Sequence, residues 1–200
     1  MLPHAGFPPR RSSTVLLLAC GLAAAAAVPA QARLDQKRVT LSVSFVQKPA
    51  VNAHATSAAF RWKRIGFASR TTCRLDKGAF RSCKGGRVTY RRLREGVHRL
   101  TLKVRGRTVT RTISFTWRVD VTAPAAPATV AGGSPAWGTA SRTLTAAGAT
   151  DTGSGLLGYQ FQLSRDGGLT WSAPQMQNPV TVNTAGESVV RFRALDKALN

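Results

Sequence analysis

Two cysteines, Cys73 and Cys83, enclose a loop of eleven residues around an Asp-Lys-Gly turn, and this loop constrains the fold more than any other stretch of the chain. A cysteine pair at this spacing around a turn indicates a disulfide across a β-excursion, with alternating strands on both sides. In the chain-entropy model such a bridge contributes about 3 kcal/mol, against about 5 to 15 kcal/mol for the whole stability of a small domain. We therefore expect an oxidised, β-rich domain around this loop.

The first 32 residues have the pattern of a secretory signal peptide. Arg10 and Arg11 precede an apolar run from Val15 to Val28, and Ala30 and Ala32 each satisfy the small-residue rule for cleavage. This predicts a signal peptide over 1–32 and a secreted or cell-surface protein. It also places the cysteines in a compartment where disulfides persist.

Two variants of this leader fit less well. Leu17-Leu18-Ala19-Cys20 has the outline of a lipoprotein box, but the apolar stretch before Cys20 is only about five residues. Arg10-Arg11 could open a twin-arginine signal, although Ser12 and Ser13 follow where a bulky apolar residue is more typical. No later segment approaches the roughly 18 consecutive apolar residues of a membrane span, so we expect none.

If Cys20 leaves with the leader, the chain keeps two cysteines, and an even count in a secreted protein favours one disulfide over a free thiol. A zinc site needs about four closely spaced ligands, and only His54 and His98 are available beside the cysteines. We therefore predict no metal site and no cofactor.

The Pro-rich stretch at 122–128 divides the remaining residues into nearly equal parts. The sequence thus predicts a domain over 35–121, a linker over 122–128 and a second domain over 129–200. Each part is slightly shorter than the about 100 residues of a typical immunoglobulin-like sandwich.

Apolar residues of the first part alternate with polar ones, which is the period of strands with one solvated face. We find no amphipathic helical run with caps after the leader. Short strands separated by turn signals are typical of an antiparallel β-sandwich. The predicted strands cover Val39 to Phe45, Ser57 to Ile65, Thr71 to Leu75, Val88 to Tyr90, Leu100 to Val104 and Ile113 to Val119.

An ordered series of residues in this part resembles the disulfide-bearing immunoglobulin-like repeat of secreted multidomain bacterial proteins, common in actinobacterial relatives. The series is Cys73, Leu75, Asp76, Gly78, Phe80, Cys83, Tyr90, Leu93, Gly96-Val97-His98, Trp117-Arg118-Val119-Asp120 and Pro124. The chain departs from it at Val104-Arg105-Gly106-Arg107, where the family usually has Arg-Ala-x-Asp and a Gly-Asn turn. The resemblance implies tandem immunoglobulin-like or fibronectin III-like sandwiches.

The second part resembles a sibling repeat. Leu157, Tyr159, Phe161 and Leu163 alternate inward before an Asp166-Gly167-Gly168 turn, and Val190, Phe192 and Ala194 supply a later inward face. The ending from Phe192 to Asn200 is similar to the family's Arg-Ala-x-Asp-x-Ala-Gly-Asn turn, with Leu199 in place of glycine. A final strand would follow this turn in the family, so we expect the second sandwich to lack its last strand.

Two groups of acidic residues invite a functional interpretation. Ser164-x-Asp166-x-Gly168-x-Thr170-Trp171 matches the Asp-box of sialidase propellers, but 200 residues cannot supply the four or so blades that a propeller needs, which makes it a turn motif. Asp151 in a Gly-Ser loop could bind calcium, which requires six to eight oxygens. No clustered Asp-x-Asp spacing accompanies it, so we predict that it does not.

No set of serine, histidine and carboxylate at matched positions indicates catalysis, and the resemblance supplies none. His98 lies at the start of a predicted strand, where a capping or packing role is the simpler interpretation. We predict that the chain is not an enzyme.

Positive charge is concentrated in the first part. The whole chain carries a formal charge of +21, and residues 35–122 contain 21 Lys plus Arg against 4 Asp plus Glu, whereas 123–200 contain 5 and 4. Strand pairing as in an immunoglobulin sandwich would turn five cations outward on one sheet: Arg74, Arg99, Lys103, Arg105 and Arg118. A field of this sign attracts polyanions. Solvated strand faces rich in arginine, protected by charge against edge pairing, are an equally good explanation.

We therefore predict a secreted, non-catalytic adhesion or spacer module of the cell surface. Its partner would be an anionic cell-wall polymer or polysaccharide. Extracellular DNA is less favoured, because Trp62, Phe115 and Trp117 fall on the buried phase. The alternative is an accessory, carbohydrate-binding or spacer region of a larger extracellular hydrolase.

Overall fold

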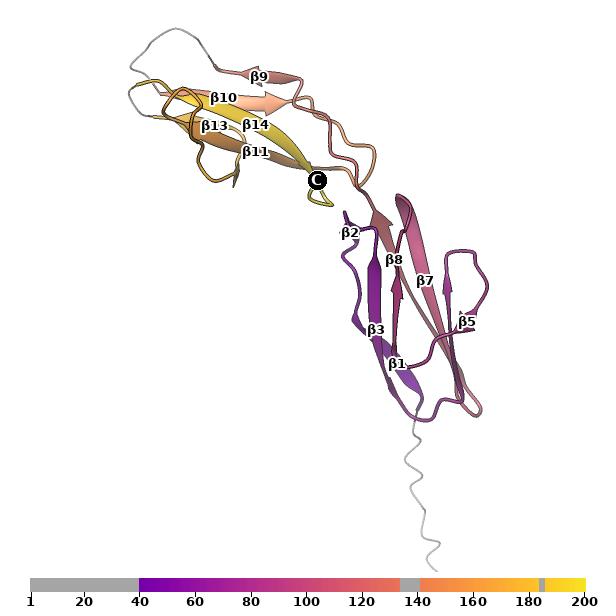
Figure 1. The fold of residues 1–200 in the computed structure, drawn as a ribbon. Helices are drawn as coiled ribbons and strands as arrows, with labels where there is room; N and C mark the ends of the chain where they lie inside the picture. The colour runs from indigo at the N-terminus through magenta and orange to yellow at the C-terminus, as the bar shows by residue number, and fades with distance from the viewer. Residues whose placement is uncertain (1–39, 134–140, 184–185) are drawn as a thin grey trace, which may run out of the picture. The chain divides into compact units, whose positions relative to one another are not determined.

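The computed structural model describes residues 40–133, 141–183 and 186–200, and every regular element in them is a β-strand (Figure 1). The predicted signal peptide, with Cys20, and the start of the first predicted strand at Val39 lie outside these residues. No helix of the described residues is long and apolar enough to cross a membrane. The all-β class expected from the alternating pattern is confirmed.

The first half forms two antiparallel sheets, with one short parallel pair at an edge. One sheet has the order β1-β3-β6 and the other the order β2-β8-β7-β4-β5. Their strands are β1 Ser42–Gln47, β2 Asn52–Ala53, β3 Ala58–Ile65, β4 Arg70–Leu75, β5 Arg81–Ser82, β6 Arg87–Tyr90, β7 Gly96–Arg105 and β8 Thr110–Val119. In Figure 1 the two sheets hold the indigo to magenta part of the chain.

The core of this half is built from the alternate residues that the sequence predicted to face inward. Phe60 of β3 and Trp117 of β8 are buried, with ring centroids 5.1 Å apart. Leu100, Leu102 and Val104 of β7 are fully buried in the same core, which also contains Cys73 and Cys83. Period-2 alternation puts one face of each strand against the facing sheet, which explains why these positions are apolar.

The opening strand, at Ser42–Gln47, begins and ends later than its alternation suggested. Leu41 is buried but precedes β1, and a register shift between Phe45 and Gln47 interrupts the pairing with β3. A bulge inserts one residue that alternation cannot foresee. Strand β2 was missed altogether, because two residues paired in parallel with Arg118 and Val119 leave no periodic signal.

The second half contains two sheets as well, each of three strands, with the orders β13-β10-β9 and β12-β11-β14. The strands are β9 Thr129–Ala131, β10 Arg142–Ala147, β11 Leu156–Ser164, β12 Gln175–Met176, β13 Val180–Val182 and β14 Val189–Asp196. Its buried apolar residues are Ala146, Phe161, Val180, Leu195 and Ala198, so its core is thinner than that of the first half. Among the described residues, no hydrogen-bonded strand crosses from one half to the other.

Two details of the second half bear on the sequence-based expectations. Leu157 does not share the inward face of β11: a register shift between Leu156 and Gly158 leaves it exposed. Strand β14 pairs with β11 and, within the described residues, with no strand on its other side. Val190 and Phe192 of β14 are half-buried.

Arginines stand directly opposite one another at two places in the first half. Arg61 of β3 is the register partner of Arg87 in β6, and Arg70 of β4 is that of Arg105 in β7. Like charges at directly opposed positions destabilise an antiparallel pair. These pairs therefore oppose the folding of the strands that carry them.

Candidate functional site: a basic sheet face

The five basic residues singled out in the sequence lie on one face of the β2-β8-β7-β4-β5 sheet. Arg99, Lys103 and Arg105 alternate along β7 on the side away from the core. Arg74 of β4 stands opposite Thr101, and Arg118 of β8 stands opposite Val97, which are in the same phase of β7. The register thus brings all five onto the outward face, which we call the basic face.

Few interactions within the protein neutralise this face. Arg99 donates a hydrogen bond to Ser114 Oγ at 2.8 Å, and the Arg74 guanidinium lies 4.7 Å from the centroid of the Phe80 ring. The ion pair found within 4.0 Å among the described residues joins His98 to Asp76 and involves no lysine or arginine. The cations of the basic face are therefore available to an external anion.

The disulfide at the margin of this face is confirmed. Cys73 and Cys83 are bonded, with Cα atoms 5.8 Å apart, and both are buried in the core. The loop between them is a β4–β5 hairpin, in which Thr72 pairs with Ser82 and Gly78 N–H donates to Leu75 O. The bridge fixes the chain that carries Phe80.

His98 lies near the start of β7, far from Arg105 at its end, and has the contacts of a packing residue. Its Nδ1 is 2.9 Å from Asp76 Oδ2, its Nε2 is 2.8 Å from the Arg94 carbonyl oxygen, and its ring lies 5.5 Å from Trp117. Burial by itself lowers the pKa of His98, but the hydrogen bonds to Arg94 and Asp76 and the charge of Asp76 outweigh it and raise the pKa above 6.5.

This raised pKa predicts a pH-dependent stability. Protonated His98 stabilises the fold fully below its unfolded pKa, and that contribution is lost as pH rises through the higher folded pKa. We expect replacement by glutamine (H98Q) to lower the free energy of unfolding by about 1 kcal/mol near pH 5.5, a modest loss because Asp76 is partly solvated. Near pH 8.5 the loss should be much smaller, because the imidazole is then neutral. Urea unfolding at the two pH values measures this. An equal loss at both would assign the effect to packing on Trp117 alone.

The Asp-box sequence of the second half is a turn, as the sequence indicated. Asp166 Oδ1 accepts hydrogen bonds from Thr170 N–H at 2.9 Å and from Ser164 Oγ at 2.7 Å, and Asp166 Oδ2 accepts one from Thr170 Oγ at 2.5 Å. These bonds from Thr170 and Ser164 lower the pKa of Asp166 to about 2. The Asp166 carboxylate therefore makes its hydrogen bonds within its own hairpin.

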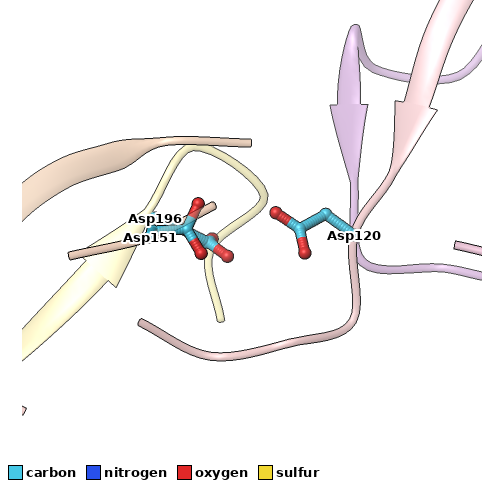
Figure 2. A group of neighbouring side chains, drawn as sticks. All are labelled: Asp120, Asp151 and Asp196. Carbon is cyan, nitrogen blue, oxygen red and sulfur yellow. The ribbon is translucent and has the colours of Figure 1, made fainter. Parts of the chain in front are cut away.

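A group of three carboxylates, from Asp120, Asp151 and Asp196, was not foreseen (Figure 2). Their ligand atoms lie within 4.8 Å of one another, and Asp120 and Asp196 are fully buried. Sequence reasoning weighed Asp151 alone, because the three residues are far apart in the chain. Closely spaced carboxylate oxygens are the ligand type that calcium prefers.

Hydrogen bonds from the protein itself also account for these three carboxylates. Asp120 accepts from Ser154 N–H, Asp151 from Gly155 N–H, and Asp196 from Asn200 N–H at 2.9 Å. A Cβ at Gly153 would overlap the Asp120 carboxylate, which explains a glycine there. Burial alone would raise the pKa of Asp120, but hydrogen bonds, those from Ser154 foremost, lower it. Asp151 and Asp196 thus each hold a local turn, and Asp120 holds the distant loop at Ser154.

The fold that positions these residues is an immunoglobulin-like or fibronectin III-like β-sandwich. No family model and no curated protein matches the chain. Similar solved structures include the fibronectin(III)-like modules of Clostridium thermocellum CbhA, with 15% identity, a TM-score of 0.46, and coverage of 78% of this chain and 87% of that one. The chicken CNTN1 FN1–FN3 domains match with 13% identity and a TM-score of 0.27, over 79% of this chain and 61% of that one.

Proposed function

We propose that this is a secreted or cell-surface protein without catalytic activity, an adhesion or spacer module that binds an anionic polysaccharide through the basic face. The observation that carries the proposal is the placement of Arg74, Arg99, Lys103, Arg105 and Arg118 on one sheet face. Cations aligned along neighbouring strands attract a linear polyanion more strongly than the same charges spread over the surface.

Composition adds to this argument. Residues 35–122 carry a net charge of +17, whereas 123–200 carry +1. A charge of that size, left without carboxylate partners on the basic face, opposes folding through self-repulsion. A bound polyanion would relieve the repulsion, so the same feature that weakens the free domain favours the complex.

The proposal predicts binding that weakens steeply with salt. The purified protein should bind polygalacturonate at about 20 mM salt and lose most of its affinity by about 200 mM, because each cation that meets the polymer releases a counterion. Replacing Arg99, Lys103 and Arg118 together by glutamine should reduce the slope of log K against log salt by about 2 to 3. Fluorescence titration or calorimetry over a salt series measures the slope.

A matched control removes three cations from the other sheet. Arg61, Lys63 and Arg87 are exposed on β3 and β6, and their triple replacement by glutamine changes the net charge equally. This variant should keep nearly the wild-type slope. Equal slopes for the two triple variants would contradict a role for the basic face, and no binding at low salt would leave these arginines as solvated strand residues.

A further inference from the structure

A groove lies on the basic face where β4, β7 and the β7–β8 hairpin meet. Its volume is about 470 Å³, and its lining includes Arg70, Lys103, Arg105 and Arg107 together with Thr72 and Phe80. The hairpin is closed by the Gly106 N–H, which donates to Val109 O at 2.7 Å. Four cationic side chains and no carboxylate line this groove. Arg70 and Arg107 were not among the residues singled out in the sequence.

The register concentrates charge at this place. Arg70 and Arg105 are directly opposed in the β4–β7 pair, so their like charges meet across the ladder. Asp76 accepts a hydrogen bond from Arg99 N–H, and Arg99 is six residues from Arg105, about 20 Å along an extended strand. At that distance the screening of physiological salt leaves the aspartate little effect on the groove. The repulsion between the two arginines thus has no nearby acidic compensation on β7.

Phe80 gives the groove an apolar side. Its ring is 40% exposed and lies 4.7 Å from the Arg74 guanidinium and 5.9 Å from Lys103 Nζ. The Cys73–Cys83 bridge closes the hairpin that carries it, so the ring is held in place before any ligand arrives. Fixing a contact residue in advance lowers the ordering cost of binding.

We infer that this groove is a specific subsite for a strand of acidic polysaccharide, in which Arg70 and Arg105 hold one oxyanion group between them and Phe80 packs on the adjoining sugar ring. Guanidinium groups bind carboxylates and phosphates through paired hydrogen bonds. This inference rests on the proposed function. It adds the position at which the polymer is anchored.

The aromatic content of the groove favours a sugar polymer over a nucleic acid. Single-stranded nucleic acids are held by several aromatic rings on which successive bases stack. Phe80 is the one aromatic residue in the lining of this groove, which suits one ring of a glycan flanked by charged groups.

The test compares three double variants that each remove two charges: R70Q/R105Q in the groove, R99Q/R118Q elsewhere on the basic face, and R61Q/R87Q in the other sheet. The last pair is also directly opposed across its ladder, so it controls for the loss of like-charge repulsion. Probes are polygalacturonate, the phosphate-bearing polysaccharide phosphomannan, neutral dextran and a single-stranded oligonucleotide, all at one ionic strength. We expect R70Q/R105Q to weaken polysaccharide binding at least about tenfold, R99Q/R118Q about two- to threefold, and R61Q/R87Q hardly at all.

A fourth variant, F80A, tests the sugar contact, with F80L keeping an apolar side chain. F80A should weaken binding of the two acidic polysaccharides about fivefold while leaving oligonucleotide binding unchanged, because the ring contacts the sugar and not the charge. Binding of polygalacturonate alone would assign a carboxylate to the arginines, and binding of phosphomannan alone a phosphate. Thermal melts verify that each variant folds.

Three results would overturn the subsite. Equal weakening by R70Q/R105Q and R99Q/R118Q would show diffuse attraction over the basic face, which leaves the proposed function standing. Tighter binding of the oligonucleotide than of either acidic polysaccharide, with F80A weakening it equally, would assign the groove to nucleic acid. No binding of any polyanion by the wild type would refute the proposed function as well.

Discussion

Replacing Cys73 and Cys83 together by serine should lower the free energy of unfolding by about 3 kcal/mol, the loop-closure entropy of an eleven-residue loop. Both cysteines are buried, at 4% and 8% exposure, so two new hydroxyls in the core add to the loss. Guanidinium unfolding measures the difference, and the variant should unfold well before the wild type.

Reduction of the wild type provides the matched control. Added reductant should bring its unfolding midpoint close to that of the double serine variant and leave the variant itself unaffected. If the unfolding midpoint of the wild type were the same with and without reductant, the disulfide would not be a source of stability. Because Phe80 is held by this loop, the reduced protein should also lose part of its preference for polysaccharide.

Trp117 should be the most costly single residue to truncate. It is 1% exposed and packs against Phe60, Phe115 and His98, with ring centroids 5.1, 6.4 and 5.5 Å away. Replacement by alanine (W117A) should lower the free energy of unfolding by about 4 kcal/mol, through lost burial and the cavity left behind. Urea unfolding followed by circular dichroism measures it.

A milder variant keeps this prediction testable if W117A does not fold. Trp117 Nε1 is buried without a hydrogen-bond partner among the described residues, so W117F removes an unsatisfied donor together with part of the ring. It should cost about 1 to 2 kcal/mol, because the two effects oppose each other. Replacing the exposed neighbour Thr116 by alanine should cost less than about 1 kcal/mol. Equal losses for T116A and W117F would place Trp117 outside the core.

Alternation alone located most strands of the first half and the residues that face its core. It worked for β3, β4, β7 and β8 because each has one face packed against the other sheet, so that every second residue must be apolar. It failed where pairing is irregular: at the bulge that exposes Leu157, and at the two-residue β2. A periodic pattern carries no information about an inserted residue.

The outward positions of the five basic residues could also be predicted, because the same alternation that buries Leu102 turns Lys103 away from the core. The groove could not be predicted from the sequence. Alternation does place Arg70 on the same outward face as Arg74. Its position opposite Arg105, however, depends on the β4–β7 register. The carboxylate group was missed for a similar reason, since Asp120, Asp151 and Asp196 meet only through tertiary structure.

The opposed arginines Arg61–Arg87 and Arg70–Arg105 make salt act in two opposite directions on one protein. Ions screen the repulsion across both ladders and so favour the folded first half, while under the proposed function the same ions would compete with the polymer for the basic face. Folding would then be most stable where polymer binding is weakest. At low ionic strength the bound polymer would replace the missing counterions, so the free protein and its complex would gain stability under contrasting ionic conditions.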